Sequence, residues 1–325
     1  MKVINQTITN DYAVYHADCV HVASGLPDNS VGLSVYSPPF PGMYVYTNSA
    51  YDMGNVQSID EMLGQYEYLQ KEMLRITMPG RNNLMHITQG VAQKGRDGYI
   101  GLKDFRGKII EMMTRIGWDY YGEITIDKNP QVKATRTKDH GLMFGTLVSD
   151  AAKLHVAMPD IVLQFRKPGE NPEPIQAGAA NRKYTEAAGW VTGDEWINWA
   201  RPVWYSQDYQ PGTWRPGYTG DSCPGGIRET DVLNVRQARE TNDERHLCPL
   251  QIGVIERIVK LWSNPGDVVF SPFTGIGSEG VVSIQEGRKF VGAELKESYY
   301  RNAIRNLENA IRERGAITLF DLEPA

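Results

Sequence analysis

The sequence predicts an α/β fold in which a mixed, doubly wound sheet carries helices on both faces. Two observations lead to this prediction. Short apolar runs rich in β-branched residues alternate with longer segments whose apolar residues recur at helical spacing. Near the end of the chain, a strand, a glycine-rich turn, a helix and a second strand follow one another between residues 267 and 294. This order is typical of a nucleoside-binding βαβ unit.

The position of that unit predicts how the sheet is connected. The chain ends at Ala325, 31 residues after Glu294, and most of this remainder forms one predicted helix. Since no room is left for more strands after the unit, the other strands must come from the N-terminal half. We therefore expect a circularly permuted, Rossmann-like sheet.

The elements alternate along the chain. Strands are predicted over 13–15, 31–36, 83–88, 118–126, 160–165, 267–270 and 290–293. Helices are predicted over 20–24, 59–77, 104–117 and 250–262, followed by one that ends at Gln285 and a last one with Gly315 as its stop. Apolar residues show no regular spacing in the segment 41–55 and in a glycine-rich stretch that reaches Gly101, so both are predicted to be loops.

Composition excludes several classes of protein. With 41% hydrophobic and 22% charged residues, the 325-residue chain resembles a soluble globular protein rather than a disordered one. No apolar run approaches the roughly 18 residues that span a membrane, and the N-terminus lacks an apolar signal region, so we expect a cytoplasmic protein. Cys19, Cys223 and Cys248 are too widely spaced for a disulfide framework or a zinc site, and no metal is expected. The formal net charge of −5 weighs against a nonspecific nucleic-acid binder, although a basic cleft can lie on an acidic body.

A short motif, Ser37-Pro38-Pro39-Phe40, directly follows the predicted strand 31–36. The prolines have a fixed φ and no N–H, so they end the strand in a stiff, extended turn. The Ser37 oxygen and the Pro38 carbonyl could accept the two N–H hydrogens of a nucleobase amino group, which would free the nitrogen lone pair to attack. Phe40 could then stack on the flipped base. Taken alone, the tetrapeptide fits an ordinary strand-terminating turn better.

The second motif is the glycine turn of the C-terminal unit. Gly275 and Gly277 allow a tight turn, and Glu294 at the tip of the next strand can accept hydrogen bonds from ribose hydroxyls. Because Gly280 completes a G-x-G-x-x-G spacing, an NAD-dependent dehydrogenase is the main rival interpretation. The permuted position argues against it, since a dinucleotide fold needs further strands after this unit. A dehydrogenase would also leave the motif at Ser37 unexplained.

With both motifs present, the chain resembles the S-adenosylmethionine-dependent DNA amino-methyltransferases of the permuted β group. In that family a Ser/Asp/Asn-Pro-Pro-Phe/Tyr catalytic motif precedes an Asp-Pro-Phe-x-Gly-x-Gly cofactor motif, and residues 37–40 and 271–277 resemble the two. The resemblance implies S-adenosylmethionine as the methyl donor and no metal. It implies the following cofactor-binding residues: Asp18, Cys19, His246, Pro249, Ser271, Pro272, Phe273, Gly275, Gly277 and Glu294. Ser271 replaces the usual Asp, so the contact to the methionine amino group is expected to be weaker or to come from another residue.

The same resemblance divides the chain into domains. It implies a catalytic half over 1–167, an inserted target-recognition region over 168–243 and a cofactor-binding half over 244–325. The insertion has no clear period, holds five of the seven tryptophans and is predicted to form a small core of its own. The implied substrate is double-stranded DNA with one base flipped out, and the expected DNA contacts are Lys133, Arg136, Arg201, Arg215 and Arg236. The oligomeric state, with a homodimer among the options, and a companion restriction nuclease are left open.

The target base and one non-enzymatic alternative also stay open. In the resembling family, Ser at the first motif position is commoner among enzymes that methylate cytosine N4, whereas Asp is commoner among enzymes that methylate adenine N6. Ser37 therefore favours cytosine N4, with adenine N6 as the alternative. The non-enzymatic alternative is a DNA-binding regulator that keeps the fold but has lost catalysis. Only Ser271 and the negative net charge support it. The joint presence of Ser37, Gly275, Gly277 and Glu294 argues against it.

Overall fold

One large mixed sheet organises the computed structural model of the chain. The structure describes residues 3–40, 52–56, 58–137, 140–142, 144–148, 150–178, 190–207, 226–233 and 250–316. Within this part, nine strands pair in the order β1-β2-β11-β10-β3-β4-β8-β7-β9. They are β1 (Asn5–Ile8), β2 (Tyr12–His16), β11 (Lys289–Glu294), β10 (Val268–Ser271), β3 (Val31–Tyr36), β4 (Thr77–Ile87), β8 (Asp160–Arg166), β7 (Asp119–Ile126) and β9 (Val203–Trp204).

The order of the strands confirms the predicted permuted sheet. β2, β11, β10, β3 and β4 are parallel neighbours, whereas β8 is antiparallel to both β4 and β7. The C-terminal strands β10 and β11 therefore lie between β2 and β3 from the N-terminal part of the chain. From β10 the chain proceeds to β11 on one side, whereas β3 is followed by β4 on the other side. The boundary between β10 and β3 is thus a topological switch point, where open α/β sheets bind ligands.

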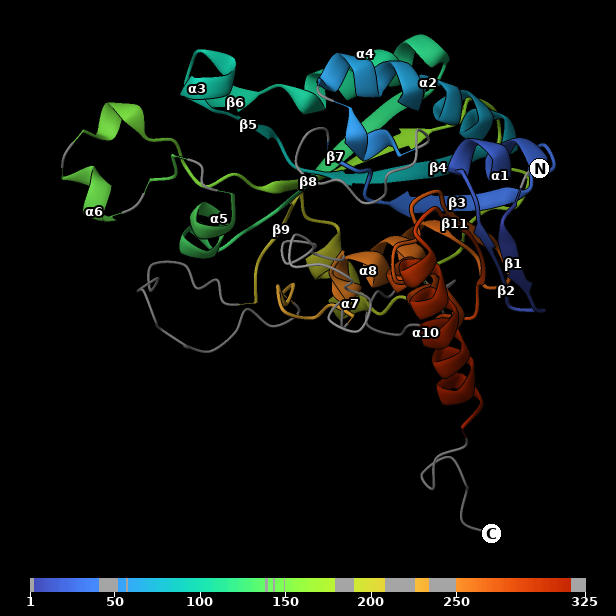
Figure 1. Cartoon of the computed structure of the whole chain (residues 1–325). Coiled ribbons are helices and arrows are strands. Elements are labelled where there is room, and N and C mark those ends of the chain that lie inside the picture. The colour runs from blue at the N-terminus through green and yellow to red at the C-terminus, as the bar shows by residue number, and fades with distance from the viewer. Residues whose placement is uncertain are drawn as a thin grey trace.

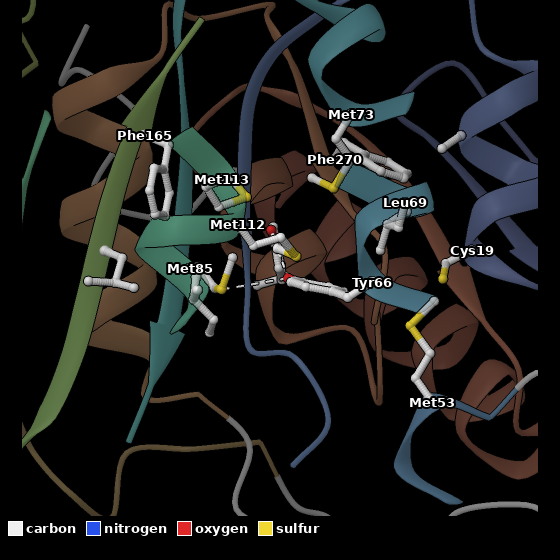
Figure 2. Packing of buried hydrophobic residues seen from close by; sticks show 14 of the residues in the cluster. Cys19, Met53, Tyr66, Leu69, Met73, Met85, Met112, Met113, Phe165 and Phe270 are labelled. Carbon is white, nitrogen blue, oxygen red and sulfur yellow. Dashed lines mark hydrogen bonds between the residues drawn. The ribbon is translucent and has the colours of Figure 1, made fainter. Parts of the chain in front are cut away.

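Helices cover both faces of the sheet (Figure 1). One face carries α1 (Cys19–Gly25), α2 (Ile59–Ile76) and α4 (Phe105–Ile116), and the other carries α8 (Ile252–Trp262), α9 (Ser278–Gln285) and α10 (Glu297–Gly315). Each face has its own buried apolar cluster. Figure 2 shows the first cluster, which contains Tyr66, Leu69 and Met73 of α2 together with Met112 and Met113 of α4. The predicted doubly wound α/β architecture is confirmed.

Several elements differ from the sequence prediction. β4 begins at Thr77, directly after α2, although we expected a strand only from residue 83. The pairing of this strand with β3 shifts its register between Thr77 and Asn82, where Gly80 has a φ of 71° and donates its N–H to the carbonyl of Lys167. The expected glycine-rich loop contains a hairpin of β5 (Gly90–Ala92) and β6 (Gly101–Lys103) around α3 (Lys94–Asp97). Short elements also follow in unpredicted places: η1 (Met53–Asn55), α5 (Pro130–Thr137), α6 (Phe144–Leu147) and η2 (Ala151–Lys153).

The described part of segment 168–243 packs on the main body. It contributes α7 (Gly193–Trp199) and the edge strand β9, which pairs with β7. Trp204 belongs to the same apolar cluster as α8, and the guanidinium of Arg257 lies over the rings of Trp199 and Trp204, 5.7 and 5.0 Å from their centroids. The buried tryptophans Trp199 and Trp204 therefore pack against the main body, in contrast to the separate small core that we expected, whereas Trp196 is exposed. The three domain boundaries remain a prediction.

Candidate active site

The carboxyl ends of the five parallel strands form one edge of the sheet. Asp18 follows β2, Glu294 ends β11, Ser271 ends β10 and Ser37 follows β3. Since neighbouring strands lie about 4.8 Å apart, the strands that carry Glu294 and Ser37 are separated by only roughly 10 Å. The two sequence motifs therefore meet at the switch point between β10 and β3.

The hydroxyl of Ser37 is anchored to the neighbouring strand. Its Oγ donates to the backbone carbonyl of His86 in β4 at 3.1 Å. Ser37, Pro39 and Phe40 are half-buried, and Pro38 is buried. The ring of Phe40 lies 5.9 Å from that of Phe105, centroid to centroid, at an interplanar angle of 57°. The turn that follows β3 is thus packed against the first apolar cluster and presents a fixed hydroxyl.

The glycine turn between β10 and α9 requires left-handed backbone conformations. Gly275 has a φ of 54° and Gly277 a φ of 91°, which residues with a Cβ rarely adopt. A Cβ on Gly277 would lie 3.2 Å from the Cα of Ala303, so this glycine also permits close packing of α10. A Cβ on Gly275 would meet no heavy atom within 4 Å among the described residues. Gly275 therefore borders open space that a ligand can approach.

Glu294 closes this turn with its carboxylate. One oxygen accepts the N–H of Gly275 and the other accepts the N–H of Lys296, both at 2.8 Å. Burial raises the pKa of Glu294 to about 7, although the two backbone hydrogen bonds favour the ionised form. Each carboxylate oxygen has a further lone pair available. The side chain can therefore still accept hydroxyl donors from a ligand.

The other residues predicted to bind the cofactor surround the same edge. Ser271 is fully buried, and its Oγ has no hydrogen-bond partner within the described ranges. The ring of Phe273 packs against those of Tyr36 and Tyr66 at centroid distances of 6.0 and 6.2 Å, and Pro272 is buried beside it. The unpaired, buried hydroxyl of Ser271, at the start of the glycine turn, could bind a polar group of a ligand.

The side chain of Asp18 has a structural role at its strand end. It caps α1 by accepting the N–H of His21 at 3.0 Å. Cys19, the first residue of α1, is buried, and this burial together with the charge of Asp18 raises the pKa of its thiol well above the ordinary value. Whether these two residues contact a cofactor remains a prediction from the resemblance.

Sequence reasoning missed the positions that several charged residues take near this edge. Glu279 lies in the first turn of α9, is 5% exposed, and has its pKa raised to about 8 by burial, with a smaller repulsion from Glu294. His86, Lys128 and Lys133 surround the carboxylate of Asp160, the first residue of β8. No spacing in the sequence links these residues, because they come from β4, β8, α5 and the segment after β7.

Comparison with known proteins decides the family. A family model for N6 and N4 methyltransferases, described as DNA methylase, matches residues 31–305. The chain belongs to the N6/N4 DNA methylase family. It is similar to the DNA adenine methyltransferase YhdJ of Escherichia coli K12, with 34% identity over 103 residues, and to the type II methyltransferase M.BglII of Bacillus subtilis, with 24% identity over 297 residues.

The match to YhdJ covers 32% of this methylase and 34% of YhdJ, and that to M.BglII covers 88% of this methylase and 66% of M.BglII. The chain thus spans from about a third to just under two thirds of these two relatives.

Solved structures confirm the fold of this methylase. The cytosine-N4-specific PvuII DNA methyltransferase superposes with a TM-score of 0.60 at 14% identity, over 96% of this chain and 95% of that one. A Thermus thermophilus protein described as a candidate DNA modification methylase, in complex with S-adenosyl-L-methionine, superposes with a TM-score of 0.62 at 18% identity, over 93% and 95% of the two chains. The predicted methyltransferase fold is therefore confirmed.

The residues predicted to contact DNA in this methylase are only partly described. Lys133 is buried, and its Nζ lies 2.6 Å from Asp160, whereas Arg201 is exposed. Arg136 lies on α5, but its side chain is outside the described part. Arg215 and Arg236, and the predicted cofactor residues His246 and Pro249, also lie outside the described residues.

The described residues of this methylase include neither a membrane-spanning helix nor a cluster of metal ligands. No helix in the described ranges is long and apolar enough to cross a membrane. No cluster of three or more His, Cys, Asp or Glu side chains in that part of the chain could hold a metal ion.

Proposed function

We propose that this chain transfers the methyl group of S-adenosylmethionine to an exocyclic amino group of a base in double-stranded DNA. The proposal rests above all on one observation. In a member of the N6/N4 DNA methylase family, the Ser37 turn follows β3, the glycine turn follows the adjacent strand β10, and Glu294 ends β11 on the other side of β10. One edge thus offers acceptors for an amine beside acceptors for a nucleoside.

The residues of the glycine turn suit S-adenosylmethionine. The carboxylate of Glu294 accepts the ribose hydroxyls with the lone pairs that Gly275 and Lys296 do not use. The open space beside Gly275 admits the nucleoside, and the unpaired hydroxyl of Ser271 faces no competing partner in the described part of the chain. When bound, S-adenosylmethionine supplies a methyl group activated by the positive charge of its sulfonium.

The residues of the Ser37 turn activate the acceptor. An exocyclic amine is a poor nucleophile because its lone pair is delocalised into the ring. The Ser37 oxygen and the Pro38 carbonyl each accept one amine hydrogen, which draws the nitrogen toward a tetrahedral geometry and frees the lone pair. Phe40 stacks on the base, which must leave the duplex to reach this position. Holding amine and methyl group in line supplies most of the catalysis, and the alkylated ammonium then loses its proton readily.

Cytosine N4 is the target that we favour. Ser37 stands at the motif position where, in the resembling family, serine is commoner among N4 enzymes. Adenine N6 is the second candidate, because the relative YhdJ is described as a DNA adenine methyltransferase and shares 34% identity over 103 residues. Both reactions use the same two acceptors, so the choice depends on the contacts to the ring edge.

A methyl-transfer assay tests the proposal. The protein is incubated with S-adenosylmethionine carrying a labelled methyl group and with unmethylated genomic duplex DNA, which offers many recognition sequences at once. We expect label in the DNA fraction for the wild type and a much lower rate for Ser37→Ala. The proposal is wrong if calorimetry shows that S-adenosylmethionine binds but the DNA acquires no label.

A further inference from the structure

A buried charged cluster lies directly behind Ser37. Because β8 runs antiparallel to β4, its first residue, Asp160, lies at the carboxyl end of β4. The carboxylate of Asp160 contacts Lys133 Nζ at 2.6 Å, Lys128 Nζ at 2.8 Å and His86 Nε2 at 3.2 Å. Asp160 is 7% exposed and the two lysines 8% and 9%, so the cluster is shielded from water.

The surroundings of Asp160 keep it ionised. Burial alone would raise the pKa of its carboxyl, but the hydrogen bond from His86 and the positive charges around it, those of Lys128 and Lys133 among them, outweigh burial and hold the pKa well below the usual range. An ionised carboxylate can only accept hydrogen bonds. The Nε2 of His86 must therefore donate to Asp160, and in the neutral ring Nδ1 is then left as an acceptor.

That acceptor points at the hydroxyl of Ser37. The Oγ of Ser37 lies 3.4 Å from Nδ1 of His86 and 3.1 Å from the carbonyl oxygen of the same residue. With the ring neutral and Nε2 donating to Asp160, neither of these atoms can donate a hydrogen to Ser37. The single hydroxyl hydrogen of Ser37 is therefore directed toward His86, and the oxygen lone pairs are directed elsewhere.

We propose that His86 is a positioning residue that, held by Asp160, fixes the Ser37 hydroxyl so that only its lone pairs face the target amine. The inference rests on the proposed function, in which Ser37 accepts a hydrogen from that amine. A hydroxyl that turned its hydrogen toward the amine would be a donor where an acceptor is needed. In this arrangement Asp160 sets the tautomer of His86, and Lys128 and Lys133 keep Asp160 in place.

Two amide substitutions separate the two ring nitrogens of His86. In His86→Gln the amide can reach Asp160 like Nε2 but leaves no acceptor at the position of Nδ1. In His86→Asn the amide oxygen lies near the position of Nδ1 but does not reach Asp160, which keeps both of its lysines. We expect His86→Gln to lower the single-turnover rate of DNA methylation by about 10- to 100-fold, the range known for residues that orient metal ligands through a hydrogen bond. His86→Asn should retain most of the rate, and both variants should bind S-adenosylmethionine like the wild type.

A double-mutant cycle with Ser37→Ala provides the decisive readout. If His86 acts through Ser37, the His86→Gln substitution should leave the residual rate of Ser37→Ala unchanged. An equal loss of rate in both backgrounds, or equal rates for His86→Gln and His86→Asn, would overturn the inference. A wild-type-like rate for Ser37→Ala would instead refute the role of Ser37 in the proposed function, so the two failures are distinguishable.

Discussion

The buried carboxyl of Glu279 makes the stability of the protein depend on pH. Glu279 lies in the first turn of α9, beside the glycine turn, and burial raises its pKa from 4.5 to about 8. The folded protein therefore keeps a proton that the unfolded chain releases. The retained proton adds to the free energy of unfolding. Its contribution is fully present below about pH 4.5 and is lost as the pH rises through 8. The neutral, equally large side chain in Glu279→Gln removes the effect.

The size of the effect follows from the shift. Each pH unit between the two pKa values is worth about 1.4 kcal/mol, so the full difference of about 3.5 units amounts to about 5 kcal/mol. Between pH 6 and pH 9 the titration with a pKa of about 8 accounts for about 3 kcal/mol of this. The free energy of unfolding of Glu279→Gln, relative to the wild type, should increase by that amount over this range.

Urea unfolding followed by circular dichroism at pH 6, 7, 8 and 9 measures the difference. Glu111→Gln, an exposed substitution on α4, serves as the control and should give no such trend. The reasoning is refuted if the free energies of unfolding of Glu279→Gln and the wild type differ by the same amount at pH 6 and at pH 9. In that case water or a cation would reach the carboxylate in the folded protein.

Three further predictions concern the site. Glu294→Ala should weaken S-adenosylmethionine binding by about 1.5–3 kcal/mol, the range for hydrogen bonds to a charged group; unchanged affinity by calorimetry would remove Glu294 as the ribose ligand. Ser37→Ala should lower the single-turnover methylation rate on DNA while cofactor affinity stays near that of the wild type, and equal rates would exclude Ser37 from the chemistry. Neutralising Arg201, Arg215 or Arg236 should reduce DNA affinity while the circular dichroism spectrum stays unchanged. For an arginine that contacts a phosphate, the slope of log affinity against log salt concentration should also fall by about one. If all three variants bind DNA normally, the insertion serves another purpose.

Periodicity and turn chemistry predicted most of the sheet. β3, β10 and β11 are short apolar runs buried on both sides of the sheet, and such runs are recognisable in the sequence because parallel strands covered on both faces need no polar residues. The permuted order could also be predicted, since the strand, glycine turn, helix and strand of the nucleoside-binding unit follow the Ser37 motif in the sequence. Edge elements were missed for the opposite reason: β1 is largely exposed and polar, and β9 has two residues, so neither has a clear pattern.

The candidate site was only partly predictable for a related reason. Ser37, Gly275 and Glu294 belong to contiguous motifs whose spacing can be seen in the sequence. His86 and Asp160 are separated by 74 residues and meet because β8 runs antiparallel to β4, which no local pattern specifies. Lys133 illustrates the same limit: it was expected to contact DNA, and in the fold its ammonium is buried against Asp160.

Mass spectrometry of nucleosides tests the central claim most directly. Unmethylated duplex DNA is treated with the protein and S-adenosylmethionine, digested to nucleosides and compared with DNA treated with Ser37→Ala. We predict a nucleoside methylated on its exocyclic amino group, N4-methylcytosine in preference to N6-methyladenine, that is strongly reduced for the variant. If neither nucleoside appears while S-adenosylmethionine binds, or if the methyl group is found on a ring carbon, the amino-transfer mechanism built on Ser37 and Pro38 is contradicted.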